Sequence, residues 1–417
     1  MQENSSAPLN KRDPRLDFFR GVAMFLILIA HTPGNWWVNW IPARLGFSDA
    51  AEIFVFCSGM ASAIAFGKIF EQQGMLMGTA RIMHRVWQVY WTHIALFFAV
   101  VTELILIDKW LSPVEHAYSG TYNLAIFFEN IRDCIFGLLT LTYVPNYWDI
   151  LPMYLVILAL VPIVMLLRRL NPYAPFVFMA TLWALAGLRY LDLPAEPWSD
   201  RRWFFNPFAW QLLFFTGFAF IRGWLPKPPI RKDWMIVAVI VIIASIPLSQ
   251  HYLLWDIKPI QDIRQWLQPV ITKTEFGLFR YLHFLALAYL GYSIATRLGD
   301  RMSGLVVDLA RKVGQQSLAV FASSLFIAQI LGTLVHLVGV NNFSVFIMNM
   351  VGFASLIGVA YVVSWFKSTP WKKHMHHPSA SGALHIHQHH RDLEEKREED
   401  TDNYARQYGA PTASPAE

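Results

Sequence analysis

The sequence predicts an all-α, polytopic membrane protein with about ten transmembrane helices and both termini in the cytoplasm. Of its 417 residues, 55% are hydrophobic and only 15% are charged, which is typical of multi-span membrane proteins rather than soluble domains. Runs long enough to cross a bilayer recur along the whole chain. They lie at 17–33, 49–69, 86–107, 149–168, 173–191, 207–223, 233–250, 277–298, 317–338 and 344–366.

Basic residues gather on alternate connections between these runs and so indicate the orientation. They are Arg81, Arg85, Arg168, Arg169, Lys227, Arg231, Lys232, Arg297, Arg301, Arg311, Lys312, Lys367, Lys372 and Lys373. Because cytoplasmic loops are enriched in Lys and Arg, we expect this side, with both termini, to be cytoplasmic. The opposite connections are long for inert loops. Within one of them, 124–128 and 135–144 are candidates for re-entrant or interfacial helices.

The composition divides the chain into three parts. Residues 1–16 are predicted to be a cytoplasmic tail, 17–366 the transmembrane domain, and 367–417 a disordered, His-rich cytoplasmic tail. Weak metal binding by that tail is less favoured than a solvated segment. Cys57 and Cys134 have no metal or redox spacing, so no metal is expected. The net charge of +5 follows from the basic loops and indicates no nucleic-acid partner.

The first apolar run contains the most unusual polar residues of the chain. Arg20 and His31 are eleven residues apart, so on a helix they share a face and are separated by roughly 16 Å. An ionisable residue within a membrane span indicates a functional site, and a neutral imidazole is the usual general base near neutral pH. The alternative is a histidine that only bonds neighbouring helices. Pro33 and Gly34 favour the functional interpretation, because broken helices at membrane depth usually line a cavity.

Two carboxylates open the next run at the same membrane level. We expect Glu52 to orient His31 or to contact a substrate hydroxyl, because an unpartnered carboxylate inside the span would be costly. Asp49 is a candidate substrate ligand, although a helix N-cap explains it equally well.

Arginines mark the opposite, cytoplasmic level. Arg81 and Arg85 share a helix face and with Arg15 and Arg20 would form a cluster suited to phosphates. The alternative for Arg81 and Arg85 is plain topological anchoring.

Polar and aromatic residues at the outer ends of several runs are further candidates for substrate binding. They are Asn35, Trp148, Asp149 and Trp210. The aromatic residues could instead belong to an interfacial belt, and Asp149 could be a cap.

These residues resemble the motifs of a known protein family and of one of its branches. The Arg20-to-His31 spacing, Ile53-Phe-Val-Phe-Cys-Ser-Gly59 and Arg81-x-x-x-Arg85 resemble motifs of the membrane acyltransferase-3 family. Arg15-Leu-Asp-Phe-Phe-Arg-Gly and Tyr147-Trp-Asp-Ile-Leu-Pro-Met-Tyr are similar to its OpgC branch, and the likeness covers roughly 12–366. The broader family usually has Trp-Ser/Thr-Leu…Glu where Trp148-Asp149-Ile-Leu stands here, which leaves the equivalence of Asp149 open.

The resemblance implies a bacterial inner-membrane O-acyltransferase that succinylates osmoregulated periplasmic glucans. It further implies succinyl-CoA as the donor, with no permanently bound cofactor, and His31 as the catalytic residue. We expect Arg20, Arg81 and Arg85 to hold the CoA phosphates while the pantetheine arm runs along the first helix. Arg44, Arg201 or Arg202 could pair with a succinyl carboxylate. The alternatives are an acetyltransferase for another envelope polysaccharide, a transporter of a glucan or acyl lipid, and a non-catalytic receptor.

Overall fold

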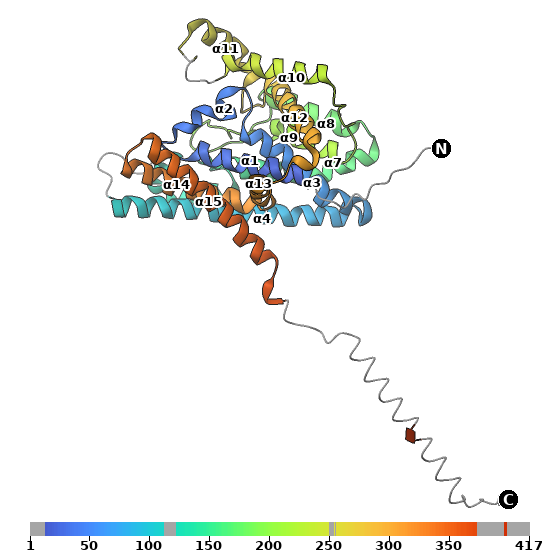
Figure 1. The fold of residues 1–417 in the computed structure, drawn as a ribbon, viewed down its shortest axis with the longest axis horizontal. Helices are drawn as coiled ribbons and strands as arrows, with labels where there is room; N and C mark the ends of the chain where they lie inside the picture. The colour runs from blue at the N-terminus through green and yellow to red at the C-terminus, as the bar shows by residue number, and fades with distance from the viewer. Residues whose placement is uncertain (1–12, 112–121, 250–253, 255, 373–395, 398–417) are drawn as a thin grey trace, which may run out of the picture. The chain divides into compact units, whose positions relative to one another are not determined.

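The computed structural model describes residues 13–111, 122–249, 254, 256–372 and 396–397, and this part of the chain is helical apart from one isolated bridge between Pro194 and Arg202 (Figure 1). Residues up to Val363 form one compact unit, and those from Ser364 onward form a second. The predicted all-α class is therefore confirmed for the described residues.

Each of the ten predicted apolar runs coincides with a helix. The helices are α1 (Pro14–His31), α3 (Ala50–Gln72), α4 (Gly74–Leu111), α7 (Ile150–Leu170), α8 (Ala174–Gly187), α9 (Pro207–Ile221), α10 (Lys232–Ser245), α12 (Leu278–Leu298), α14 (Ser317–Val338) and α15 (Asn342–Lys367). The predicted tail, which ends at residue 16, overlaps the first three residues of α1, because Pro14 occupies the first helical position. Residues 1–12 and most of the His-rich tail lie outside the described residues.

Within the described part of the chain, five helices are long and apolar enough to cross a membrane: α3, α7, α14, α15 and the segment Leu278–Arg301 that includes α12. The apolar helices α8 and α9 have only 14 and 15 residues. At about 1.5 Å per residue they are shorter than the roughly 30 Å hydrocarbon core. The membrane-protein class is supported, while the count of ten spans and the side of the termini stay predictions.

Shorter helices fill the connections. They are η1 (Trp36–Trp40), α2 (Pro42–Leu45), α5 (Ala125–Glu129), α6 (Ile131–Thr140), η3 (Ile246–Leu248), α11 (Lys258–Ile271), η4 (Gly299–Arg301), α13 (Leu305–Gln315) and η5 (Pro370–Lys372). The helices α5 and α6 lie close to the segments predicted in that connection. The sequence missed α11 and α13, because both are amphipathic rather than continuously apolar. In α13, for example, Ala310 and Val313 are buried while Asp308 is exposed.

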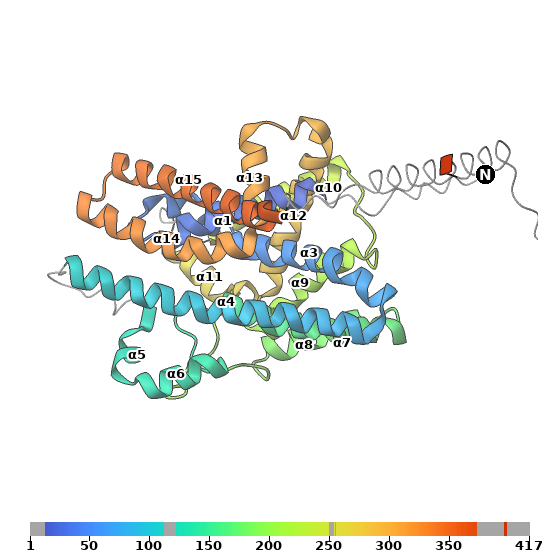
Figure 2. The same ribbon diagram turned by 90° about the horizontal axis from the view of Figure 1, so that it is seen from below.

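The helix α1 lies at the centre of the packing that positions the site. It packs against α3, α13 and α14, while α3 also packs against α4 and α9. Figure 2 shows α1 and α14 side by side, with α4 running along α14. The ends of α1, α3, α4 and α14 are thereby held in fixed relative positions.

The backbones of α3 and α9 approach each other closely at two glycines. A Cβ atom on Gly59 would lie 1.9 Å from the carbonyl oxygen of Phe214, and one on Gly217 would lie 2.3 Å from that of Phe56. Because the blocking atoms belong to helix backbone, they cannot move aside as a side chain would. This contact is accordingly restricted to glycine.

We expect Gly59→Ala to lower the thermal unfolding midpoint in detergent, since overpacking a core usually costs about 1–3 kcal/mol. Gly358→Ala is the matched control, because a Cβ atom at Gly358 in α15 meets no atom within 4 Å. Equal midpoints for the two variants would contradict the close approach of α3 and α9.

Candidate active site

His31 is the last residue of α1, and its imidazole is held by its own helix. The chain leaves the helix at Thr32, and Gly34 has φ +73°, a backbone conformation that favours glycine. The predicted break after His31 is therefore confirmed. The Nδ1 atom lies 2.7 Å from the carbonyl oxygen of Ile27. Since a carbonyl only accepts hydrogen bonds, Nδ1 carries the proton, and Nε2 of the neutral ring keeps its lone pair.

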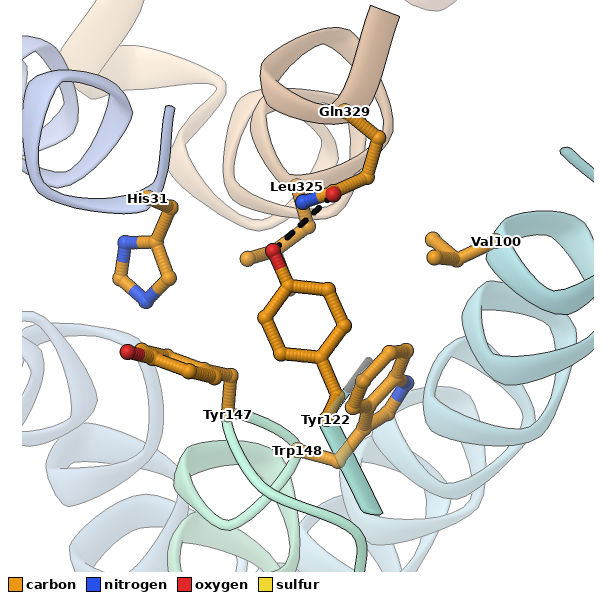
Figure 3. Close-up of a pocket in the computed structure, with 7 residues that line it drawn as sticks. All are labelled: His31, Val100, Tyr122, Tyr147, Trp148, Leu325 and Gln329. Carbon is orange, nitrogen blue, oxygen red and sulfur yellow. Dashed lines mark hydrogen bonds between the residues drawn. The ribbon is translucent and has the colours of Figure 1, made fainter. Parts of the chain in front are cut away.

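His31 lines a small aromatic pocket at the junction of α1, α4, α14 and two connections. The lining residues are His31, Val100, Tyr122, Tyr147, Trp148, Leu325 and Gln329 (Figure 3). The cavity is about 10 Å³, close to the smallest volume that holds one water molecule. In this conformation the pocket therefore accommodates a group the size of a hydroxyl.

Tyr147 and Tyr122 shape the pocket around His31. The ring of Tyr147 packs edge-to-face against the imidazole, with the ring centroids 5.2 Å apart. In Figure 3 the His31 nitrogen that lies farther from the backbone, Nε2, faces this tyrosine. The hydroxyl of Tyr122 donates to Oε1 of Gln329 at 2.9 Å. Both tyrosines have positive φ angles, of 73° and 60°, which are uncommon for residues with side chains and cluster at functional sites.

Trp148 is one predicted substrate ligand that the structure places in this pocket. Its side chain is buried, and its Nε1 atom has no hydrogen-bond partner among the described residues. A buried indole N–H usually has a partner, so Trp148 has a donor available for a ligand or water.

A cluster of charged residues surrounds the start of α3. A carboxylate oxygen of Glu52 accepts from Nη1 of Arg280 at 2.8 Å, and the other accepts from the backbone N–H of Asp49 at 2.8 Å. Asp49 caps the helix by accepting from the N–H of Ala51 at 2.7 Å, and it forms an ion pair with Lys273. The cap interpretation of Asp49 thus holds, and the two acids together form a capping box.

The charge of this cluster reaches His31. Asp49 and Lys273 both lie within electrostatic range of the imidazole. Burial raises the pKa of Asp49, but Lys273, a hydrogen bond with Glu52 and the charge of Arg280 together outweigh burial and hold the pKa of this carboxyl below its usual range. Asp49 is therefore ionised and forms a salt bridge with Lys273 near neutral pH.

Glu52 has partners other than the one predicted. Its carboxylate binds Arg280 and the backbone of Asp49, while Ile27 holds the Nδ1 atom of His31. The prediction that Glu52 orients the imidazole directly is corrected: the helix carbonyl does so, because it lies one turn before His31. Glu52 instead fixes Arg280.

Three other predicted substrate ligands are engaged in bonds between segments. Asn35 and Asn349 exchange two side-chain hydrogen bonds, of 2.8 and 3.2 Å. The Nε1 atom of Trp210 donates to the carbonyl of Lys273 at 2.9 Å. Asp149 accepts from the N–H of Phe204 at 3.1 Å. None of the three is among the residues that line the pocket.

The four predicted phosphate-binding arginines fall into two groups. On α1, Arg15 binds Asp13 and Thr296, and Arg20 donates to the hydroxyl of Ser317. On α4, Arg81 is exposed and Arg85 donates to Gln88 at 3.1 Å. The two groups thus lie on different helices, α1 and α4, each of which packs against α3.

Several residues of the site were not predicted from the sequence. Arg280 and His283 lie in α12, and His283 Nδ1 is 2.6 Å from the Ser48 hydroxyl. The sequence does indicate these two residues, because two ionisable side chains three positions apart interrupt an apolar run. Tyr122, Gln329 and Lys273 left no comparable signal, because only the tertiary fold brings them to α1 and α3.

Comparisons with known proteins extend these observations. The model of the family described as OpgC protein matches residues 12–368. A search of curated proteins and a search of solved structures each found no significant match. Among the described residues, no group of three or more His, Cys, Asp or Glu side chains could hold a metal ion.

Asp149 predicts a pH dependence of folding. Burial, opposed by the N–H of Phe204 and by Arg201, raises the pKa of this carboxyl to about 6. The pKa of an aspartate in an unfolded chain is about 3.9. Between about pH 4 and 6 the folded protein therefore binds more protons than the unfolded protein, and its free energy of unfolding falls as the pH rises through this range. We expect Asp149→Asn, which keeps the acceptor oxygen, to flatten the slope of the unfolding midpoint between about pH 4 and 6. The exposed Asp133→Asn should leave the slope unchanged, and an equally steep slope in Asp149→Asn would contradict the assignment.

Proposed function

Because this chain belongs to the OpgC protein family, we propose that it transfers a succinyl group from succinyl-CoA to hydroxyls of osmoregulated periplasmic glucans. Family membership implies an acyltransferase role. The proposed location is the bacterial inner membrane, where a cytoplasmic thioester and a periplasmic sugar can meet. The observation that carries the proposal is the His31 pocket, in which a histidine with a fixed tautomer faces a cavity of hydroxyl size.

His31 acts as the general base in this proposal. Its Nε2 lone pair takes the proton of a glucan hydroxyl while the hydroxyl oxygen attacks the thioester carbonyl. The carbon–sulfur bond then breaks, and the departing thiolate receives the proton from the imidazolium. Ile27 supports the step by accepting from Nδ1 throughout, which keeps Nε2 directed at the acceptor.

The donor enters from the arginine end of α1. Arg20 and His31 lie on one continuous helix, so roughly 16 Å separate them along its axis, a length suited to an extended pantetheine arm. Arg81 and Arg85 form no ion pair within the described part of the chain. Their guanidinium groups are therefore available for phosphate oxygens.

Lys273 supports succinyl over acetyl as the acyl group. Its ammonium lies within electrostatic range of His31 and forms an ion pair with Asp49, so it is the described basic group that we assign to a succinyl carboxylate. Arg201 and Arg202, two candidates named from the sequence, are ion-paired as Lys273 is, with Glu196 and Asp192. Unlike Lys273, they are not among the charged groups that act on His31.

We expect His31→Ala to lower the rate of ester formation by about 100- to 10,000-fold, the usual contribution of a general base. Purified protein is incubated with succinyl-CoA and glucan, and mass spectrometry follows the ester. His84→Ala, which removes an exposed histidine of α4, is the matched control. Full activity in His31→Ala would exclude the base assignment, and a wild-type protein that moves glucan without forming ester would be a transporter.

We expect Arg81→Ala combined with Arg85→Ala to raise KM for succinyl-CoA by about tenfold, because two charge-assisted phosphate contacts are lost. The control is Arg297→Ala combined with Arg301→Ala, another exposed pair with the same spacing on the same predicted side. An unchanged KM in the first variant would reduce Arg81 and Arg85 to topological anchors.

A further inference from the structure

A second, larger cavity opens in the connection between α8 and α9. Its volume is about 360 Å³, and its lining includes Arg189, Tyr190, Asp192, Asp200, Arg201 and Arg202. This volume lies within the range of small-ligand sites. The residues proposed for catalysis are not part of it, so the cavity requires a separate explanation.

Each arginine that lines this cavity is paired with a carboxylate. Arg189 pairs with Glu275 at 3.3 Å, and Arg201 pairs with Glu196 at 3.0 Å. Arg202 likewise forms an ion pair with Asp192. An anionic ligand would have to compete with these carboxylates. A neutral ligand rich in hydroxyl groups, by contrast, can donate to the acids and accept from the guanidinium groups without breaking the pairs.

An exposed aromatic ring completes the cavity. The side chain of Tyr190 is 76% exposed and offers an apolar face beside the polar groups. A sugar ring presents the same combination, with C–H groups on its faces and hydroxyls around its edge. The chemistry of the lining therefore matches a neutral carbohydrate.

One backbone segment links the cavity to the His31 pocket. Nη2 of Arg201 donates to the carbonyl of Val144 at 2.7 Å, and the N–H of Val144 donates to the carbonyl of Ala195 at 2.8 Å. Two residues further on, the N–H of Asn146 donates to the carbonyl of Tyr122 at 3.2 Å. The next residues, Tyr147 and Trp148, line the His31 pocket. One short segment thus binds Arg201, which lines the cavity, and supplies Tyr147 and Trp148 to the His31 pocket.

We propose that the cavity bounded by Tyr190, Asp200 and Arg201 is an acceptor subsite that binds the neutral sugar units next to the unit being acylated. The choice of glucan rests on the proposed function, whereas the match to a neutral polyhydroxylated ligand rests on the cavity alone. The subsite should make affinity for the acceptor increase with glucan length.

Binding without transfer tests this inference directly. In the His31→Ala background, calorimetry compares a glucose disaccharide with a long periplasmic glucan. We expect the long glucan to bind at least about fivefold more tightly. Tyr190→Ala or Asp200→Ala should remove most of that advantage, since the first deletes the aromatic face and the second the carboxylate acceptor. Tyr173→Ala is the matched control, because Tyr173 precedes α8 as Tyr190 follows it and is 73% exposed.

The outcomes separate this inference from the proposed function. Equal affinity for short and long glucans, or an unchanged length advantage in both cavity variants, would overturn the subsite. Displacement of glucan by millimolar succinate or phosphate, dependent on Arg201, would overturn the neutral-ligand assignment. A length advantage that depends on Tyr190 in a protein whose wild type forms no ester would support the subsite and refute the transfer reaction.

Discussion

The ion pair between Glu52 and Arg280 is the constraint on which the site depends. Glu52 is fully buried, and an isolated carboxylate at that depth would be very costly. Two donors offset the cost, the Asp49 amide and the Arg280 guanidinium. Arg280 is held in turn, because its Nε donates to the carbonyls of Ile271 and Thr272 at 3.3 and 3.2 Å. Removing either charge would leave the other unpaired, so α3, α12 and the connection before α12 are fixed as one assembly.

Lys273 extends this assembly toward His31. Its ammonium pairs with Asp49 and lies 5.4 Å from the ring of Phe205, while its carbonyl accepts from Trp210 of α9. The backbone and side chain of one residue therefore join the starts of α3 and α9. Since the same ammonium acts on the imidazole of His31, the scaffold that offsets a buried charge also sets the field at the proposed base.

The sequence predicted the positions of the ten apolar helices because apolar runs are a local signal. It also indicated His31 and Glu52 as candidates, because ionisable groups are costly in such runs. It could not predict that Arg280 is the partner of Glu52, since 228 residues separate them. The sequence also could not predict that the Ile27 carbonyl orients His31, because every residue has a backbone carbonyl. Polarity alone predicted substrate binding by Asn35, Trp210 and Asp149. In the fold, the polar groups of these residues form hydrogen bonds between segments of the chain instead.

The size of the His31 pocket bears on how a transferase avoids hydrolysis. A thioester beside a general base reacts with water unless water is excluded. The cavity of about 10 Å³ has room for one hydroxyl and is walled by aromatic rings, so a sugar hydroxyl that enters replaces the only water the cavity could hold. The sugar ring itself must remain outside or displace Tyr147, whose side chain is 53% exposed and whose backbone is held at a positive φ. The residue that narrows the pocket is thus also the one whose movement would admit the acceptor.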